Sequence, residues 1–278
     1  MQWLCLVVLA LANVAWSDDR AVYEVDIDGI FDEIEIKAPV TVEVQQADQA
    51  SVWVNTPRLL RNNLIMQQRG KRLLIAWKVD DRWLNMVDSE SIKVKIQLPQ
   101  LRVLTSKGSG TVYLGDMQLQ DFTYNNSGSG DAHMSSVRAQ NISIAMQGNG
   151  DLEAVLWSAD RLSIASMGSS DIWLAKLMAK DVSINSAGSG DLDIIDTSSA
   201  DSVEISLMGS GDIDATQLHA VSASVKILGS GDILITVDES ISATVLGSGD
   251  VKYGGTPNAV SVSQIGSGDV SALEGDES

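Results

Sequence analysis

The chain has 278 residues and a formal net charge of -18 at pH 7, with 37 Asp and Glu against 19 Lys and Arg. This acidic excess argues against nucleic acid or an anionic membrane surface as a partner, because both require a basic protein face. The single cysteine, Cys5, lies in a segment expected to be removed, so no disulfide or thiolate chemistry is expected in the mature protein.

Residues 1–17 are predicted to be a cleaved export signal. An apolar run over residues 4–14 has the length of a signal-peptide core and is too short to cross a bilayer as a helix. The small residues Ala15 and Ser17 predict cleavage before Asp18. A buried N-terminal strand is the alternative, because the usual Lys or Arg ahead of the run is missing. No membrane span is predicted in the mature protein, since no later segment approaches about 20 consecutive apolar residues.

Residues 18–100 alternate apolar and polar side chains, but their corners are irregularly spaced. Ile34 and Ile36, like Val42 and Val44, show the period of two that is typical of half-buried strands. No linker separates this region from the repeats that follow. It is therefore predicted to form irregular N-terminal rungs of the same domain.

A short turn, Gly-Ser-Gly-Asp or a near variant, recurs along residues 101–272. The first glycines of its nine copies are Gly108, Gly128, Gly148, Gly168, Gly188, Gly209, Gly229, Gly247 and Gly266. Rungs of about 20 residues cannot bury an apolar face alone, so they must stack through parallel strand pairing. The sequence predicts an all-β, single-domain parallel β-helix, or solenoid, followed by an acidic tail at residues 273–278.

Each rung is predicted to contain two strands, joined by the glycine corner and by a corner with a small residue such as Ala179. Before the glycines, apolar residues alternate with serine, as in Ile142, Ser143 and Ile144. The paired glycines indicate either a positive φ or a close backbone approach. Ser170 replaces the second glycine of the fourth copy, which predicts a strained turn or a negative φ at that position.

Several segments in combination resemble a known family. They are Ile34-Glu35-Ile36, Val42-Glu43-Val44-Gln45, the strand at residues 70–75, Leu98-Pro99-Gln100-Leu101, the Gly-Ser-Gly-Asp series and the closing segment at residues 247–257. Over nearly the whole mature chain they look like the putative auto-transporter adhesin head GIN domain. The resemblance implies a right-handed β-helix in an exported bacterial protein of the periplasm or cell surface. It also implies a binding role, and it brings no catalytic residues.

One aspartate occupies the same place in eight rungs, at Asp131, Asp151, Asp171, Asp191, Asp212, Asp232, Asp250 and Asp269. Stacked carboxylates repel one another, so some interaction must offset the repulsion. The favoured interpretation is that each carboxylate accepts hydrogen bonds from backbone N–H groups of its own corner. The alternative is a row of calcium sites that includes Asp191, Asp212 and Asp232, although calcium β-rolls supply ligands more densely. No other metal and no cofactor is predicted.

A second column is predicted to face outward from the strand after each glycine corner. It contains Tyr113, His133, Glu153, Trp173, Asp193, Asp214, Leu234, Lys252 and Ser271. Aromatic faces stack on sugars and carboxylates accept hydrogen bonds from hydroxyls, so Trp157, Trp173, Glu153 and Asp193 are the predicted glycan site. Alternatively, the two tryptophans only stabilise an exposed sheet face. His133 is isolated in sequence, and a surface or structural role is predicted for it.

Another set of apolar residues directly precedes turn glycines, at Met167, Met208, Leu228, Leu246 and Ile265. These side chains are predicted to belong to the core. If they face outward instead, they form an apolar stripe that suits a homo-oligomer interface.

Together these features predict an exported, non-enzymatic envelope or surface protein that binds a glycan or a cell-envelope protein along one face of the β-helix. No catalytic residue is predicted, because no singular acid and base cluster is apparent. A β-helix polysaccharide lyase or hydrolase is one alternative, and it requires a unique acid and base in a groove. A self-assembling structural scaffold is the other.

Overall fold

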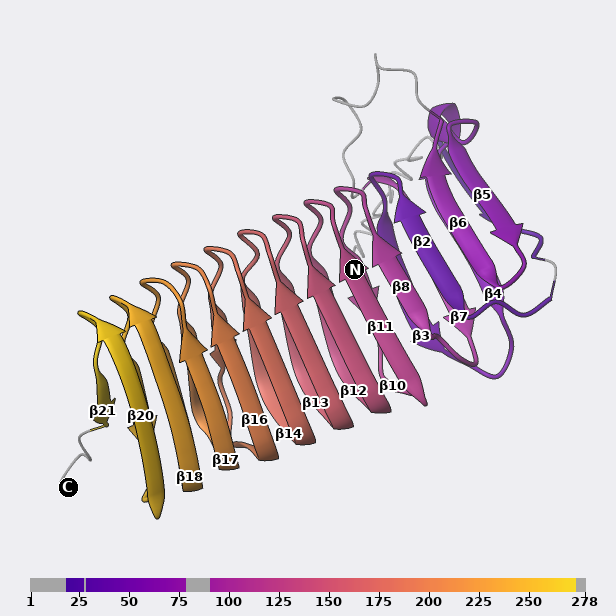
Figure 1. Ribbon diagram of the computed structural model, residues 1–278. Helices are drawn as coiled ribbons and strands as arrows, with labels where there is room; N and C mark the ends of the chain where they lie inside the picture. Colours follow the sequence, from indigo (N-terminus) through magenta and orange to yellow (C-terminus); the bar gives the residue numbers. More distant parts are fainter. Residues whose placement is uncertain (1–18, 28, 79–90, 274–278) are drawn as a thin grey trace, which may run out of the picture.

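The chain forms a parallel β-helix in which each rung lies on the preceding one (Figure 1). The computed structural model describes residues 19–27, 29–78 and 91–273. The predicted signal at residues 1–17 lies outside them, as does the predicted tail apart from Leu273. The described part is all-β and includes the short 3-10 turn η1 (Arg58–Leu60), so the predicted fold class is confirmed.

The regular rungs extend from β8 to β21. The strands are β8 (Val103–Ser106), β9 (Val112–Leu114), β10 (Met117–Gln118), β11 (Asp121–Asn126), β12 (Ala132–Met146), β13 (Leu152–Ser166), β14 (Ile172–Ser186), β15 (Leu192–Ile194), β16 (Ser198–Leu207), β17 (Ile213–Ile227), β18 (Ile233–Gly247), β19 (Val251–Gly254), β20 (Ala259–Gly266) and β21 (Val270–Ala272). Successive rungs pair in parallel, with Ala132 opposite Leu152 and Leu152 opposite Ile172. One repeat of the sequence is therefore one rung of the solenoid.

The long rungs bend twice, so they have three sides and not the two strands predicted from the sequence. In β12 the alternation of buried and exposed residues is interrupted between Met134 and Val137, and again between Ala139 and Ile142. Register pairs are also missing within these two intervals. The extra side adds an inward column that the sequence analysis did not identify, at Met117, Val137, Trp157, Leu177, Ser198 and Leu218.

The apolar core runs along the axis as stacked, equivalent side chains. Ile144, Ile164, Ile184 and Ile205 follow one another in register, and each is at most 1% exposed. Full burial of such a side chain stabilises a protein by about 1.5–3 kcal/mol. Because each isoleucine is covered by the equivalent residues of the neighbouring rungs, the rungs depend on one another for this stabilisation.

Close backbone approach, the second of the two predicted reasons, explains most of the glycine corners. A Cβ on Gly188 would lie 1.9 Å from the carbonyl oxygen of Gly168. Among the described turn glycines of the repeats, only Gly247 and Gly266 have a positive φ. Ser170 has no positive φ either, and its buried hydroxyl donates a hydrogen bond to the Gly148 carbonyl oxygen at 3.1 Å.

Four of the five apolar residues that precede turn glycines lie on the surface, so the prediction that they belong to the core is wrong for these four, whereas Leu246 is half-buried. Met167, Met208, Leu228 and Ile265 are 55%, 52%, 37% and 69% exposed. Each follows the last inward position of its strand, and the alternation of the strand therefore points it outward. They form an exposed apolar stripe beside the glycine corners.

The N-terminal strands continue the solenoid and then close it. They are β1 (Arg20–Glu24), β2 (Glu33–Lys37), β3 (Thr41–Gln46), β4 (Ser51–Pro57), β5 (Leu64–Arg69), β6 (Arg72–Trp77) and β7 (Lys93–Leu98). Strands β2 and β3 pair in parallel with β8 and β9 of the regular rungs, whereas β1, β4 and β5 are joined by antiparallel pairing. Tyr23 and Leu60 pack against the core at this end.

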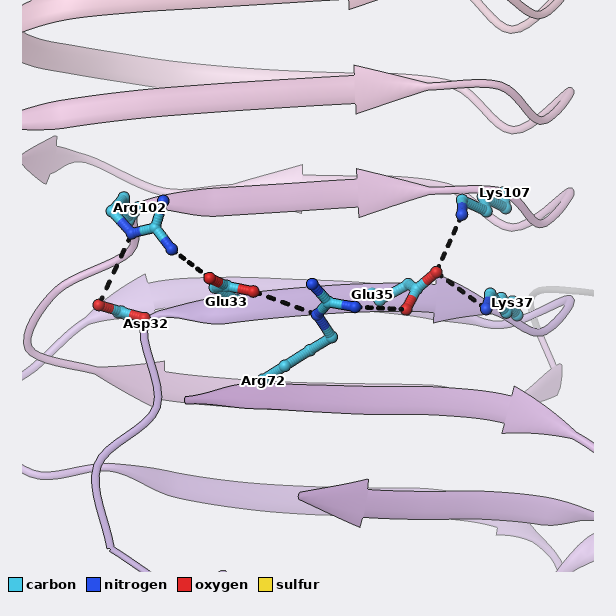
Figure 2. A network of polar contacts seen from close by, with 7 residues as sticks. All are labelled: Asp32, Glu33, Glu35, Lys37, Arg72, Arg102 and Lys107. Carbon is cyan, nitrogen blue, oxygen red and sulfur yellow. Dashed lines mark hydrogen bonds and ion pairs between the residues drawn. The ribbon is translucent and has the colours of Figure 1, made fainter. Parts of the chain in front are cut away.

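An ion network ties the N-terminal strands to the first regular rung (Figure 2). The Glu35 carboxylate, 13% exposed, accepts hydrogen bonds from Lys37 Nζ at 2.9 Å and Lys107 Nζ at 3.0 Å. Arg72 of β6 bridges two carboxylates: its Nη1 lies 3.6 Å from Glu35 Oε2, and its Nε lies 3.1 Å from Glu33 Oε2. Burial opposes ionisation of Glu35, but the hydrogen bonds from Lys37 and Lys107 outweigh it and lower the pKa of this carboxyl.

The close backbone approach at the glycine corner predicts that adding a single methyl group strongly lowers stability. Gly188→Ala should lower the free energy of unfolding by about 1–3 kcal/mol, because the added methyl overlaps the Gly168 carbonyl and separates two rungs. Urea denaturation measures the loss, with the exposed neighbour Ser189→Ala as a matched control that should change little. An unchanged midpoint for Gly188→Ala would contradict the close approach.

The ion network predicts a pH-dependent contribution to stability. A lowered pKa means that the Glu35 carboxylate stabilises the fold above its unfolded-state pKa, and that this stabilisation is lost as the pH falls through the folded-state value. Glu35→Gln should therefore cost about 0.5–1 kcal/mol at neutral pH and almost nothing near about pH 3. Urea denaturation at both pH values tests this, with exposed Glu204→Gln as the control. An equal loss at both pH values would show that the contribution is not electrostatic.

Candidate functional site

Outward side chains from the strands that follow the glycine corners form one row along the solenoid. Strand pairing places in this row Glu43, Tyr113, His133, Glu153, Trp173, Asp193, Asp214, Leu234, Lys252 and Ser271. The arrangement predicted from Tyr113 to Ser271 is confirmed, and Glu43 of β3 extends it. Sequence reasoning missed Glu43 because the N-terminal region lacks the glycine repeat that aligns the other members.

Part of this row lines a groove with a volume of about 820 Å³. The groove extends across several rungs, from Thr41 at the start of β3 to Ile195 after β15. Val155 and Ile195 also line it and are 60% and 56% exposed. Apolar surface and the polar row therefore meet in one shallow depression.

Tyr113, His133 and Glu153 come from three successive rungs and contact one another. The Tyr113 and His133 rings are stacked, with centroids 5.1 Å apart and planes 16° from parallel. His133 Nδ1 lies 2.8 Å from Glu153 Oε2. His133, although isolated in sequence, thus contacts both neighbours in the row. Its place in the aligned column between Tyr113 and Glu153 was the signal that could have shown these contacts.

Trp173 continues the row between two carboxylates, those of Glu153 and Asp193. Burial raises the pKa of Asp193, and the neighbouring carboxylates of Asp214 and Asp191 raise it further. A hydrogen bond from the Trp173 side chain acts in the opposite direction. The structure thus brings Glu153, Trp173 and Asp193 together, as predicted.

Trp157 does not belong to the site, and its prediction as an outward aromatic is wrong. Its side chain is fully buried between Val137 and Leu177 in the inward column of the third side. The bend after Ala154 shifts the alternation by one residue, so Trp157 points inward. The other aromatic side chains that line the groove with Trp173 are instead the stacked rings of Tyr113 and His133.

The aspartates of the glycine corners form a ladder, but their hydrogen bonds differ from those predicted. From Asp131 to Asp250, each Oδ1 accepts the backbone N–H of the aspartate in the next rung, and not one from its own corner. Asp191, for example, accepts from Asp212 at 2.8 Å, and Asp212 accepts from Asp232 at 2.8 Å. In the described part of the chain, no three or more His, Cys, Asp or Glu side chains are arranged to hold a metal ion. The alternative of calcium sites at Asp191, Asp212 and Asp232 stays untested.

The fold and this row define a parallel β-helix with an aromatic and acidic surface groove. The chain belongs to the family described as putative auto-transporter adhesin, head GIN domain, whose model matches residues 30–202 and 193–257. The family resemblance is thereby confirmed, and a surface protein with a binding role is what an adhesin family implies. None of the described helical segments is long and apolar enough to cross a membrane.

Solved structures share this fold. A putative adhesin from Parabacteroides distasonis ATCC 8503 is 20% identical, with a TM-score of 0.68 over 91% of this chain and 97% of that chain. A putative adhesin from Parabacteroides merdae ATCC 43184 is 16% identical, with a TM-score of 0.60 over 92% and 97%. A putative lipid binding protein from Parabacteroides distasonis ATCC 8503 is 23% identical, with a TM-score of 0.58 over 92% and 97%. No match was found among curated proteins.

The surroundings of Asp193 predict a stabilising substitution. Its raised pKa means that the ionised carboxylate destabilises the fold at pH values above that pKa. Asp193→Asn should therefore raise the free energy of unfolding at neutral pH by about 0.2–1 kcal/mol, the size of repulsion between like charges on neighbouring strands. The gain should shrink as the pH falls through the folded-state pKa of Asp193 and vanish below the unfolded-state pKa.

Urea denaturation across this pH range measures the effect. Asp160→Asn is the matched control, because Asp160 lies 2.7 Å from Lys180 Nζ and its neutralisation should bring no gain. A loss of stability in Asp193→Asn at neutral pH would contradict the repulsion.

Proposed function

We propose that the protein is exported to the periplasm or cell surface and binds a glycan, without catalysis, in the groove centred on Tyr113 and Trp173. The observation that carries this proposal is the alternation of aromatic and carboxylate side chains along one row of the groove. Aromatic faces supply apolar area for sugar rings, and carboxylates accept hydrogen bonds from hydroxyl groups.

The sheet supports recognition because it holds these groups in place before a ligand arrives. Tyr113, His133, Glu153 and Trp173 each lie on a strand that is paired on both sides. Little ordering of the protein would then oppose binding. Rungs repeat at about 4.8 Å, so a linear polymer lying along the axis would meet one side chain of the row after another.

The charge of the groove favours a neutral or amino-bearing glycan over a polyanionic one. Its lining contains the carboxylates of Glu43 and Glu153, and Asp193 follows Trp173 in the same row. The lining also contains the positively charged Lys93, but the chain as a whole carries a formal net charge of -18. A uronate polymer would be repelled by this potential.

A β-helix polysaccharide lyase or hydrolase remains the second candidate, because one observation favours it. His133 and Glu153 form an acid–base pair in the groove, with Tyr113 stacked on the histidine. Such a cluster was the feature that the sequence analysis required of an enzyme. The family is described as adhesins, and a binding role without catalysis accords with that description.

The binding proposal predicts that aromatic truncation in the groove weakens glycan binding. A glycan array with the purified protein identifies a ligand, and titration calorimetry then compares variants. Trp173→Ala and Tyr113→Ala should each weaken binding by roughly tenfold or more, because each removes a stacking face. His219→Ala is the control, since His219 is an exposed aromatic ring that does not line the groove.

Circular dichroism and melting temperature show whether the variants retain the fold. A glycan whose affinity survives both aromatic substitutions would overturn the proposed site. Cleavage of the bound glycan by the wild-type protein, abolished by His133→Ala, would show that the protein is an enzyme and not a binding protein.

A further inference from the structure

Apolar side chains lie beside the carboxylates of the groove. Val155 follows Glu153 by two positions and is 60% exposed. Ile195 follows Asp193 by two positions and is 56% exposed. In each pair the residue between the two is buried, so both members point outward from the same side of the extended chain. Val155 and Ile195 also line the groove, so each presents an apolar surface next to a carboxylate there.

These two pairs recur with a period of two rungs. Strand pairing places Trp173 between Glu153 and Asp193. The residue two positions after Trp173 is the small Ala175, which lines the groove as well. Because rungs repeat at about 4.8 Å, the two pairs lie about 10 Å apart along the axis. A carboxylate with an apolar neighbour thus lies on each side of a flat aromatic ring.

Both carboxylates are in a position to accept a hydrogen bond from a ligand. The Glu153 side chain is 58% exposed, although its Oε2 lies 2.8 Å from His133 Nδ1. Asp193 is half-buried and accepts a hydrogen bond from the Trp173 side chain. An N–H group is a favourable donor to a carboxylate, and the exposed apolar neighbours favour a ligand group that carries a methyl beside that N–H.

An acetamido group has both properties, because its N–H donates a hydrogen bond and its methyl is apolar. A hydroxyl group donates a hydrogen bond but offers no methyl to Val155 or Ile195. A protonated amine also donates, but its charge would lose water against these two side chains without an apolar contact in return. The combination of carboxylate and apolar side chain therefore distinguishes an N-acetylated amino sugar from its hydroxyl and amine counterparts.

The spacing of the two pairs suits an extended polymer of β-linked hexoses. Successive sugars of such a polymer are turned over, so every second sugar presents the same edge to the protein. The distance between these edges is close to two rungs of the solenoid. The sugar between them would lie over Trp173, whose ring supplies a flat apolar face.

We propose that the groove selects a linear polymer of N-acetylated amino sugars and holds the acetamido groups of every second sugar, one at Glu153 and Val155 and the next at Asp193 and Ile195. The inference rests on the proposed function and names the substituent that the groove recognises. Val155 and Ile195 determine specificity, whereas Trp173 supplies stacking that β-linked hexoses have in common.

Three hexasaccharides with the same β-linked backbone test the proposal, those of N-acetylglucosamine, glucosamine and glucose. In titration calorimetry the purified protein should bind the first at least roughly tenfold more tightly than either of the others, because an apolar contact of this size discriminates by about that factor. Saturation-transfer NMR should show stronger transfer to the acetyl methyl protons than to the ring protons.

Variants of the apolar pair show where the preference originates. Val155→Ser combined with Ile195→Ser should bring the affinity for the N-acetylglucosamine hexasaccharide to within about threefold of that for the glucose hexasaccharide. Val221→Ser is the matched control, since Val221 is a 38% exposed valine that does not line the groove, and it should keep the full preference. Circular dichroism establishes that the variants fold.

The outcomes separate this inference from the proposed function. Equal affinities for the three hexasaccharides, all weakened by Trp173→Ala, would overturn the inference and leave glycan binding in the groove intact. Tightest binding of the glucosamine hexasaccharide, or a preference for the N-acetylated one that survives the double serine variant, would also overturn the inference alone. Failure to bind any glycan on an array would overturn the proposed function and the inference with it.

Discussion

Backbone contact at the glycine corners governs the rest of the structure. The Gly168 carbonyl oxygen lies where a Cβ of Gly188 would be, and it also accepts a hydrogen bond from Ser189 N–H at 3.2 Å. Corners this close hold each strand at pairing distance from the next and prevent slippage between rungs. The same register then stacks Ile144, Ile164 and Ile184 inside the solenoid.

Stacking gathers side chains on the surface as well as in the core. Tyr113, His133, Glu153 and Trp173 are far apart in sequence but adjacent in the row, because each occupies the same place in its rung. The same repetition places aspartates above one another, where each carboxylate accepts the N–H of the next. These hydrogen bonds offset a repulsion that the repeat would otherwise accumulate.

The N-terminal strands depart from the regular repeat and cover the core there. Antiparallel strands, η1 and the ion network around Glu35 complete the N-terminal end with groups that are paired or packed. In the regular rungs the core continues from one strand to the next without such elements, as where Val260 lies in register on Ile241.

The sequence by itself determined the rung length, the parallel stacking and the outward row, because periodic spacing and alternation are local properties that every rung repeats. Residues such as Ile144 and Trp173 could therefore be placed correctly. The tertiary structure alone decided the side of Trp157, the acceptor role of each aspartate toward the next rung, and the contact of His133 with Glu153. A bend within a strand reverses the alternation beyond it, and contacts between rungs depend on distances that a linear pattern does not contain.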